Sequence, residues 1–276
     1  VFSIGFGYRE QMKNNHTFVI CTYKDSPYLE ECIRALECQT IKSDIIISTS
    51  TPTPNVEKLA ELHNIPLYTH NQGGSIGKDW NYGFAIPKTK YLTLAHQDDV
   101  FLKDFLETNI TKLEENKGAV LAFTNYSEID KNSKIIRKNR NIKIKNLMLI
   151  PIGLFDRSSF VRNLIFSFGD PICSPTITYN MNILSGFRFS ETICAAIDWE
   201  AFYRINKIRG KWIYTDEILM YHRIHDESET SKKIEFSRRT EEERIMFQKY
   251  WPKPIAEIIL RQYVKAQKAN ITAKEK

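Results

Sequence analysis

Two adjacent carboxylates stand out in the sequence LAHQDDV, residues 94–100, where Asp98 and Asp99 follow a short apolar run. That run, residues 91–95, is predicted to be a buried strand, and open α/β sheets bind ligands at the carboxyl ends of their strands. A hard cation such as Mg²⁺ or Mn²⁺ takes oxygen ligands, usually one or two carboxylates together with substrate phosphates. An aspartate here is equally well explained as the cap of a helix predicted from Phe101. Taken alone, the pair leaves both interpretations open.

A further acidic residue, Asp198, stands at the start of an aromatic-rich helix predicted over residues 199–208. It fits a general base or an N-cap, and taken alone the cap is favoured because aspartate is a common capping residue. In the later sequence YHRIHDES, His222 and His225 could be surface residues, hydrogen-bond donors to phosphate or metal ligands.

Two other nucleotide-binding patterns are excluded. The sequence GGSIGKD, residues 73–79, resembles a Walker loop, but its glycine spacing is one residue short and Asp79 replaces the Ser or Thr that would ligate Mg²⁺. No GxGxxG follows the first predicted strand, which argues against a dinucleotide-dependent dehydrogenase.

Alternating strands and helices position these residues. Strands are predicted over residues 17–22, 44–48, 65–69, 91–95 and 120–124, and helices from Pro27 and over 55–63, 75–85 and 101–115. The alternation predicts an α/β fold with a mostly parallel sheet and helices on both faces. Beyond it lie a weakly patterned basic stretch (125–153), a helix (155–168), a loop (169–175), strands (212–214, 219–224) and a tail of two helices broken at 251–254.

Composition narrows the class further. The 276 residues are 42% hydrophobic, enough for one large core, and the net charge is +6. The basic stretch from Lys232 to Arg244 is interleaved with glutamates, so a solvated helix face is favoured over a site for acidic partners. Five cysteines without a CxxC pair predict a reducing, cytoplasmic setting. No run of about 18 apolar residues predicts a membrane span.

The order of these features resembles the family 2 glycosyltransferases of the GT-A fold over residues 16–230. Residues 18–24 (FVICTYK) with 28–40 are similar to the family's opening strand and helix, and 71–83 to its glycine-rich segment ending in Asn-x-Gly. Residues 91–99 resemble the strand leading to the DxD metal motif, Ile197-Asp198 the acidic pair that carries the base, and Arg223-Ile-His225 with Ser228 the closing segment.

Three departures from the family pattern affect the expected site. His96 replaces the first DxD aspartate, which leaves Asp98 to hold the metal with Asp99 beside it. Residues 48–52 (STSTP) replace the usual Asp-Asp-Gly-Ser, so the nucleobase is not determined. Ile197 replaces the first acid of the pair, which leaves Asp198 as the candidate base.

The resemblance implies an inverting transfer from a nucleotide-diphosphate sugar, UDP- or dTDP-linked, to a hydroxyl of a glycan, free or lipid-linked or protein-linked, in bacterial surface-glycan synthesis. Asp98 and His225 are expected to hold Mn²⁺ or Mg²⁺, and Asp198 to act as the base. Contacts to the nucleotide sugar are expected from Thr22, Tyr23, Asp25, Ser50, Lys78, Asn81, His96, Gln97, Asp98, Asp99 and Arg223.

The expected organisation is a catalytic domain over residues 1–230 followed by a helical extension over 231–276. The catalytic domain divides into a nucleotide-sugar half (16–124) and an acceptor half (125–230). In the tail, Ile255, Ile258, Ile259 and Val264 alternate with Lys253, Arg261, Lys265 and Lys268. This pattern fits a helix on the inner face of the membrane, but packing on the domain or a homodimer contact is favoured.

Two other functions fit parts of the pattern. A nucleotidyltransferase would also place carboxylate-bound Mg²⁺ beside a nucleotide, but the opening lacks its Gly- and Arg/Lys-rich phosphate loop. A basic nucleic-acid-binding module would show a clustered basic face, so no nucleic-acid partner is expected.

Overall fold

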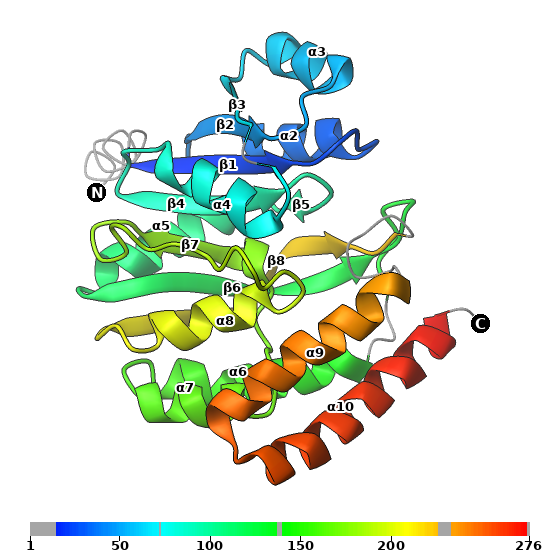
Figure 1. The fold of residues 1–276 in the computed structure, drawn as a ribbon. Helices are drawn as coiled ribbons and strands as arrows, with labels where there is room; N and C mark the ends of the chain where they lie inside the picture. Colours follow the sequence, from blue (N-terminus) through cyan, green and yellow to red (C-terminus); the bar gives the residue numbers. More distant parts are fainter. Residues whose placement is uncertain (1–14, 72, 137–139, 226–232, 275–276) are drawn as a thin grey trace.

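The computed structural model describes residues 15–71, 73–136, 140–225 and 233–274. Its centre is an eight-stranded sheet in the order β3-β2-β1-β4-β7-β6-β8-β5 (Figure 1). The strands are β1 (His16–Thr22), β2 (Asp44–Thr49), β3 (Leu67–Thr69), β4 (Tyr91–His96), β5 (Val100–Phe101), β6 (Ala119–Ile129), β7 (Ile177–Asn180) and β8 (Lys211–Arg223).

The first four strands in the sheet order form a parallel half, as the alternating pattern predicts. β1 pairs in parallel with β2 and β4, and β2 with β3. The connecting helices are α2 (Leu29–Glu37), α3 (Pro54–Leu62) and α4 (Ile76–Ala85). Because these strands run the same way, the residues after β1, β2 and β4 meet at one edge of the sheet.

The other half of the sheet is mixed. β7 lies antiparallel between β4 and β6, whereas β8 runs parallel to β6 and antiparallel to the two-residue strand β5. The helix predicted from Phe101 begins only at Phe105, as α5 (Phe105–Glu115), because Phe101 pairs with Met220 of β8. The two strands predicted over 212–224 are one strand with register shifts against β6.

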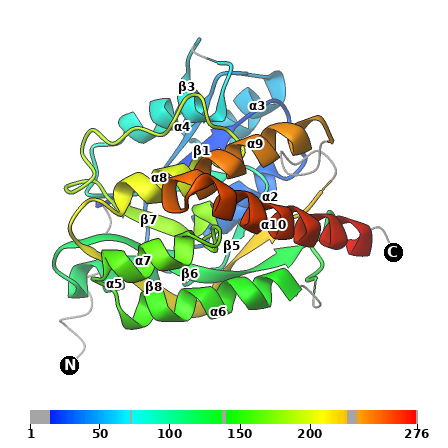
Figure 2. The ribbon, with the colours of Figure 1, turned by 60° about the horizontal axis from the view of Figure 1, so that its bottom comes forward.

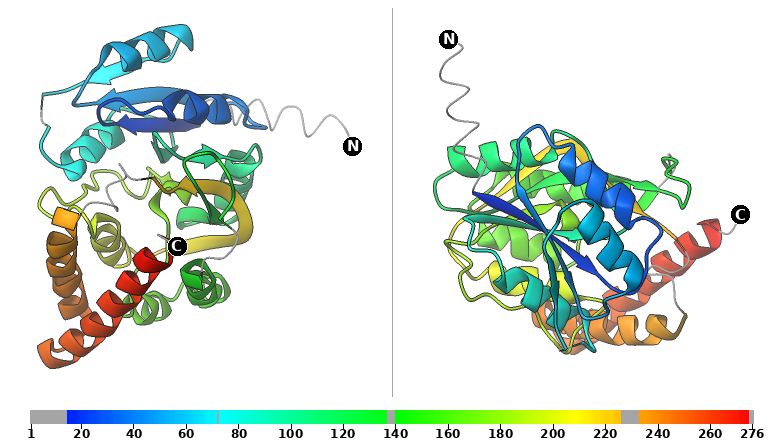
Figure 3. Two further views of the ribbon diagram at one scale, coloured as in Figure 1. Left: turned by 90° about the vertical axis from the view of Figure 1, so that its right-hand side faces the viewer. Right: turned by 90° about the horizontal axis from the view of Figure 1, so that it is seen from above.

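Each face of the sheet carries its own core, and strand alternation decides which side chain joins which. In β1, Phe18 and Ile20 pack toward α2, α3 and α5, while Val19 packs on the opposite face with α4. Figure 3 shows helices on both sides of the sheet. The core on the α4 side of the sheet also holds residues from α6 (Arg140–Leu154), α7 (Ser159–Phe166), α8 (Ile197–Ile205), α9 (Lys233–Tyr250) and α10 (Lys253–Lys274).

Helix α6 corrects the prediction of a weakly patterned stretch over 125–153. Its apolar residues point to both of its faces, so no amphipathic periodicity shows in the sequence. The break between α9 and α10 falls at Trp251 and Pro252, where a helix was predicted to end. Within the described ranges no helix combines the length and the apolar content that crossing a bilayer requires.

Candidate active site

Asp98 and Asp99 lie between β4 and β5, at the edge where the parallel strands end. The capping interpretation of the pair is wrong, because α5 begins at Phe105 and its N-cap position is Asp104. Free of that role, both carboxylates are held by residues from the end of β8 and just beyond it. The antiparallel pairing of Val100 with Tyr221 brings β8 alongside and places these partners there.

Asp99 is fully buried and strongly bonded on one oxygen. Its Oδ1 accepts a hydrogen bond from the backbone N–H of Arg223 at 3.1 Å and lies 2.9 Å from Nδ1 of His222. Burial opposes a charge on His222, but the Asp99 carboxylate outweighs it and raises the pKa of His222 to about 9. Oδ2 of Asp99 has no hydrogen-bond partner among the described residues and lies 3.7 Å from Nδ1 of His96.

Asp98 is more accessible, with 18% of its side chain exposed. Its Oδ2 lies 2.9 Å from Nε2 of His225. Burial would raise the pKa of Asp98, but the hydrogen bond from His225 and the neighbouring His96 and His222 lower it overall, so this carboxylate stays ionised.

His96, Asp98 and Asp99 form a cluster that suits a divalent cation. One ligand atom from each lies within 4.8 Å of the others, and the unpartnered Oδ2 of Asp99 is among the oxygens available. Carboxylates together with one imidazole fit Mn²⁺ or Mg²⁺ chemically. His225, expected as a ligand, reaches the cluster through its bond to Asp98.

Arg223 connects the chain segments that surround the site. Its guanidinium is fully buried and donates to the Asp98 carbonyl, the Asp130 carbonyl, the Ser133 hydroxyl and the Glu31 carboxylate, the last at 2.6 Å. The same group lies over the ring of Tyr28. These contacts tie the turn after β4 to α2 and to the turn after β6. Ser228, the last residue of the expected closing segment, lies outside the described residues.

The expected nucleotide contacts line the ends of β1 and β2. Tyr23 and Gln97 exchange hydrogen bonds, with the Gln97 amide joined to both backbone polar groups of Tyr23. Asp25 accepts a hydrogen bond from Thr53, and the Thr22 hydroxyl is buried without a partner among the described residues. Lys24 adopts a positive φ of 57°, and its N–H donates to Thr51.

Helix α4 brings the glycine-rich segment to the same edge. Lys78 lies in its first turn, where burial raises the pKa of Asp79 and the Ser50 side chain opposes the shift. The side-chain amide of Asn81 accepts a hydrogen bond from the Phe189 N–H at 2.6 Å and donates one to the Phe189 carbonyl at 3.0 Å. These two bonds join α4 to the loop before α8.

Asp198 occupies the first turn of α8, and its capping interpretation is wrong. The helix begins at Ile197, its N-cap is Ala196, and the cap is made by Glu242 from α9. Burial raises the pKa of Asp198, opposed by His96 and the Ser174 hydroxyl. One carboxylate oxygen is buried without a hydrogen-bond partner within the described chain, so it is available to accept a proton.

Glu242 is an unpredicted part of the site. Its Oε2 accepts hydrogen bonds from the N–H groups of Cys194, Ala195 and Ala196 at 3.0, 2.6 and 3.1 Å. Only 7% of its side chain is exposed, and Arg238 bonds its other oxygen. In the sequence it stands in a run of three glutamates that is typical of a solvated helix face, so nothing distinguished it.

Asp170 adds a second carboxyl near Asp198. Burial, and next the charge of Asp198, raise the pKa of Asp170 to about 8. Its Oδ1 accepts a hydrogen bond from the N–H of Ile172, which orders the loop between α7 and β7. At neutral pH Asp170 therefore holds a proton beside Asp198.

Comparison with known proteins places these features in a family. A family model described as glycosyl transferase family 2 matches residues 17–190. An uncharacterized glycosyltransferase of Rickettsia bellii is 26% identical over 225 residues, 79% of this chain but 31% of its own length. A second relative, from Rickettsia typhi, is 24% identical over 78% of this chain and 65% of its own length. The chain thus spans less than two thirds of either relative.

Solved structures share the fold at low identity. S. aureus TarS 1-349 in complex with UDP-GlcNAc superimposes with a TM-score of 0.64 at 14% identity, covering 91% of this chain and 71% of that one. The mannosyltransferase PcManGT from Pyrobaculum calidifontis, in complex with GDP-Man and Mn2+, gives 0.63 at 13%, covering 91% and 69%.

Proposed function

Because the chain belongs to glycosyl transferase family 2, we propose that it transfers a sugar from a nucleotide-diphosphate sugar to an acceptor hydroxyl and inverts the anomeric centre. The fold is the α/β GT-A fold with a helical C-terminal tail. The observation that carries the proposal is the cluster of His96, Asp98 and Asp99 at the carboxyl end of β4.

The donor side of the proposal uses the edge formed by β1, β2 and β4. Asp98 and Asp99, with His96, hold the cation, and His225 orients Asp98. When bound there, a divalent cation supplies positive charge that stabilises the leaving diphosphate. Thr22, Tyr23, Asp25 and Ser50 contact the nucleotide, with Lys78 beside the phosphates. A UDP- or dTDP-sugar is favoured.

The acceptor side uses Asp198. Its buried, unpartnered oxygen takes the proton of the acceptor hydroxyl as that oxygen attacks the anomeric carbon from the face opposite the diphosphate. A single displacement of this kind inverts the anomeric centre. The acceptor is a glycan, free or carried on a lipid or a protein, in bacterial surface-glycan synthesis.

The proposal also covers the domain organisation of the chain and its place in the cell. Residues 16–124 bind the donor, residues 125–230 the acceptor, and residues 231–276 extend the catalytic domain. None of the five cysteines, all of which lie in the described part of the chain, forms a disulfide. This supports a reducing cytoplasmic setting, with peripheral contact at the inner face of the membrane. A homodimer through the tail is part of the same proposal.

The test is a screen of nucleotide sugars for nucleotide release with Mn²⁺, with Mg²⁺ and with chelator. We expect turnover that needs the cation, and we expect Asp98→Ala to remove most of it while leaving the unfolding transition in place. Asp44→Ala is the matched control, because Asp44 is an exposed aspartate at the opposite end of β2. Wild-type turnover by Asp98→Ala in metal-free buffer, or pyrophosphate release from a nucleoside triphosphate, would contradict the proposal.

A further inference from the structure

Helix α6 presents apolar side chains on two opposite faces. Leu149 and Ile152 are buried in the core, at 1% and 0% exposure. On the other side Leu147 and Leu154 are 68% and 73% exposed, with Ile144 and Ile150 in the same stripe. Although α6 also carries polar residues such as Lys143 and Lys145, its outer stripe leaves four large apolar side chains in contact with water.

Helix α7 extends this apolar surface. Figures 1 and 2 show it beside α6, in the half of the molecule away from α3. Phe160 is 75% exposed and Leu164 50% exposed, one turn apart on the same side of α7. We call the combined surface the α6–α7 face. Its members are Ile144, Leu147, Ile150, Leu154, Phe155, Phe160, Leu164 and Phe168. Contiguous exposed apolar groups of this number mark an interaction site.

The charges around the α6–α7 face have one sign. Residues 140–168 contain five basic side chains and one acid, but Arg162 is buried at 1% exposure and does not border the face. The acid, Asp156, is paired with Lys211 at 3.3 Å. Lys143 and Arg157 are exposed within the face. The partner is therefore expected to be apolar where it meets the leucines and anionic at their border.

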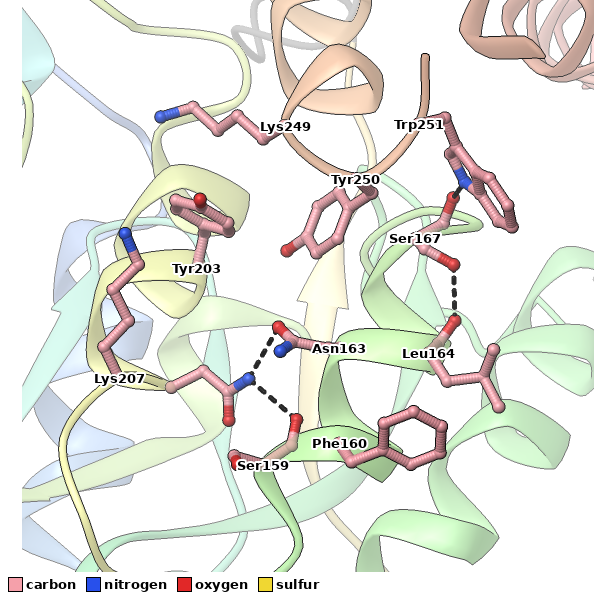
Figure 4. A pocket seen from close by; sticks show the side chains of 11 residues that line it. Ser159, Phe160, Asn163, Leu164, Ser167, Tyr203, Lys207, Lys249, Tyr250 and Trp251 are labelled. Atoms are coloured by element: carbon pink, nitrogen blue, oxygen red, sulfur yellow. Dashed lines mark hydrogen bonds between the residues drawn. The ribbon is translucent and has the colours of Figure 1, made fainter.

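A cavity at the border of the α6–α7 face also combines apolar and basic side chains. It has a volume of about 530 Å³ and lies between α7, α8 and the turn after α9. Phe160 and Leu164 line one side, and Lys207 and Lys249 project from the other, with the Tyr203 ring between them (Figure 4). Both ammonium groups lie over the Tyr203 ring, and that of Lys249 is also 3.8 Å from Glu200. An apolar wall opposite two lysines matches an acyl chain with a phosphate headgroup.

We propose that the α6–α7 face docks on the surface of an anionic phospholipid bilayer. The leucines and phenylalanines enter the boundary between headgroups and acyl chains, and the lysines pair with lipid phosphates. This rests on the peripheral membrane contact in the proposed function, to which it gives a surface, and it does not depend on sugar transfer. In α10, where the sequence suggested a membrane contact, Ile259 and Val264 pack against the core, which leaves Ile255 and Ile258 exposed, at 43% and 61%.

The experiment is co-sedimentation of the intact chain with vesicles of phosphatidylcholine alone or mixed with phosphatidylglycerol. We expect binding to the mixed vesicles that weakens as salt rises. Leu147→Ser/Leu154→Ser/Phe160→Ser should reduce it at least tenfold, and Lys207→Gln/Lys249→Gln should remove the preference for anionic lipid. Leu62→Ser is the control, since Leu62 is 65% exposed on α3.

Unfolding curves of the variants establish that they are folded. The proposal is overturned if wild-type protein stays in the supernatant at low salt, or if the triple variant sediments like the parent. It is also overturned if light scattering shows a dimer that the triple variant dissociates, because the face is then a contact between two copies. Nucleotide release measured without vesicles is expected to be unchanged, so failure of docking and failure of sugar transfer are separable.

Discussion

Asp98 and Asp99 are neighbours in the chain, but the fold gives them different environments. Asp99 is buried and paired with a charged His222, whereas Asp98 is partly exposed and bonded to His225. A sequence with two adjacent aspartates predicts a site at the strand end but cannot assign these environments. The assignment depends on β8, which lies more than 100 residues downstream and is brought to the pair by its pairing with β5 and β6.

At Asp198 the fold favours a proton acceptor. Asp198→Asn keeps the shape of the side chain but removes its basic oxygen, so we expect transfer to fall by about 10²–10⁴-fold with donor binding nearly unchanged. Burial raises the pKa of Asp198 above its ordinary 3.8. The rate of the parent should therefore fall as pH drops through that raised pKa, because the protonated carboxyl cannot accept a proton.

Transfer rates from pH 4.5 to 8 and donor titrations check this prediction. Glu217→Gln, at an exposed position of β8, serves as the control. Near-parental transfer by Asp198→Asn, or a loss of donor binding in its place, would show that Asp198 is a structural acid.

Helices and strands with a clear apolar pattern were predicted from the sequence, whereas those whose formation depends on distant parts of the chain were not. The strand and helix pattern up to α4 follows from apolar runs bounded by turn residues, and the structure confirms it. Strand β7 was missed because its four residues are too short to show a period. Helix α6 was missed because both of its faces are apolar, and the role of Glu242 because its partners are backbone groups 46 to 48 residues away.

Glu242 links the C-terminal helix α9 to the start of α8. Glu242→Ala leaves three N–H groups without their acceptor, which should lower the free energy of unfolding by about 1–3 kcal/mol. We also expect kcat to fall roughly tenfold with KM for the donor unchanged, because a small displacement of Asp198 is enough to impair proton transfer. Glu242→Gln restores an acceptor oxygen and should recover part of both losses.

Urea unfolding and steady-state kinetics measure the two effects. The control is Glu241→Gln, whose side chain is 60% exposed on the same helix. If Glu242→Ala alters stability alone and leaves kcat at the parental value, Glu242 supports the fold without positioning Asp198.

The stability of the whole molecule should depend on pH through His16. This residue on β1 is 1% exposed, with Ser43 and Thr93 hydroxyls on its two ring nitrogens at 2.7 and 3.0 Å. Burial lowers its pKa from 6.5 to about 3. Between these values the unfolded chain binds a proton that the folded chain does not, so stability is lost as pH falls from 6.5 toward 3.

Titration of His16 can change the free energy of unfolding by at most about 1.4 kcal/mol per pH unit. His16→Gln does not titrate, so its unfolding free energy should decline less steeply between pH 7.5 and 5. Urea midpoints at several pH values measure the difference. Parallel curves for the two proteins would mean that His16 does not control the acid sensitivity.

The tail packs on the domain, one of the two arrangements favoured from the sequence, and contributes to the same core as the sheet. Met246, Phe247, Ala256 and Leu260 are all buried, at 0% to 2% exposure, in the core that also contains Val19 of β1 and Trp199 of α8. Burying a large apolar side chain is worth about 1.5–3 kcal/mol. Three of these four are large, so their loss removes roughly 5–9 kcal/mol, which compares with the 5–15 kcal/mol of a typical domain.

We therefore expect a chain ending at residue 232 to lose its cooperative unfolding transition. It exposes the faces of α7 and α8 that α9 and α10 cover, and it also lacks the Glu242 cap. A chain ending at Lys265 keeps all four buried residues and should unfold within a few degrees of the parent. Calorimetry of both chains measures the difference. A sharp transition near the parental temperature in the shorter chain would show instead that residues 233–276 are dispensable for the fold, because the sheet and the helices up to α8 would then be stable alone.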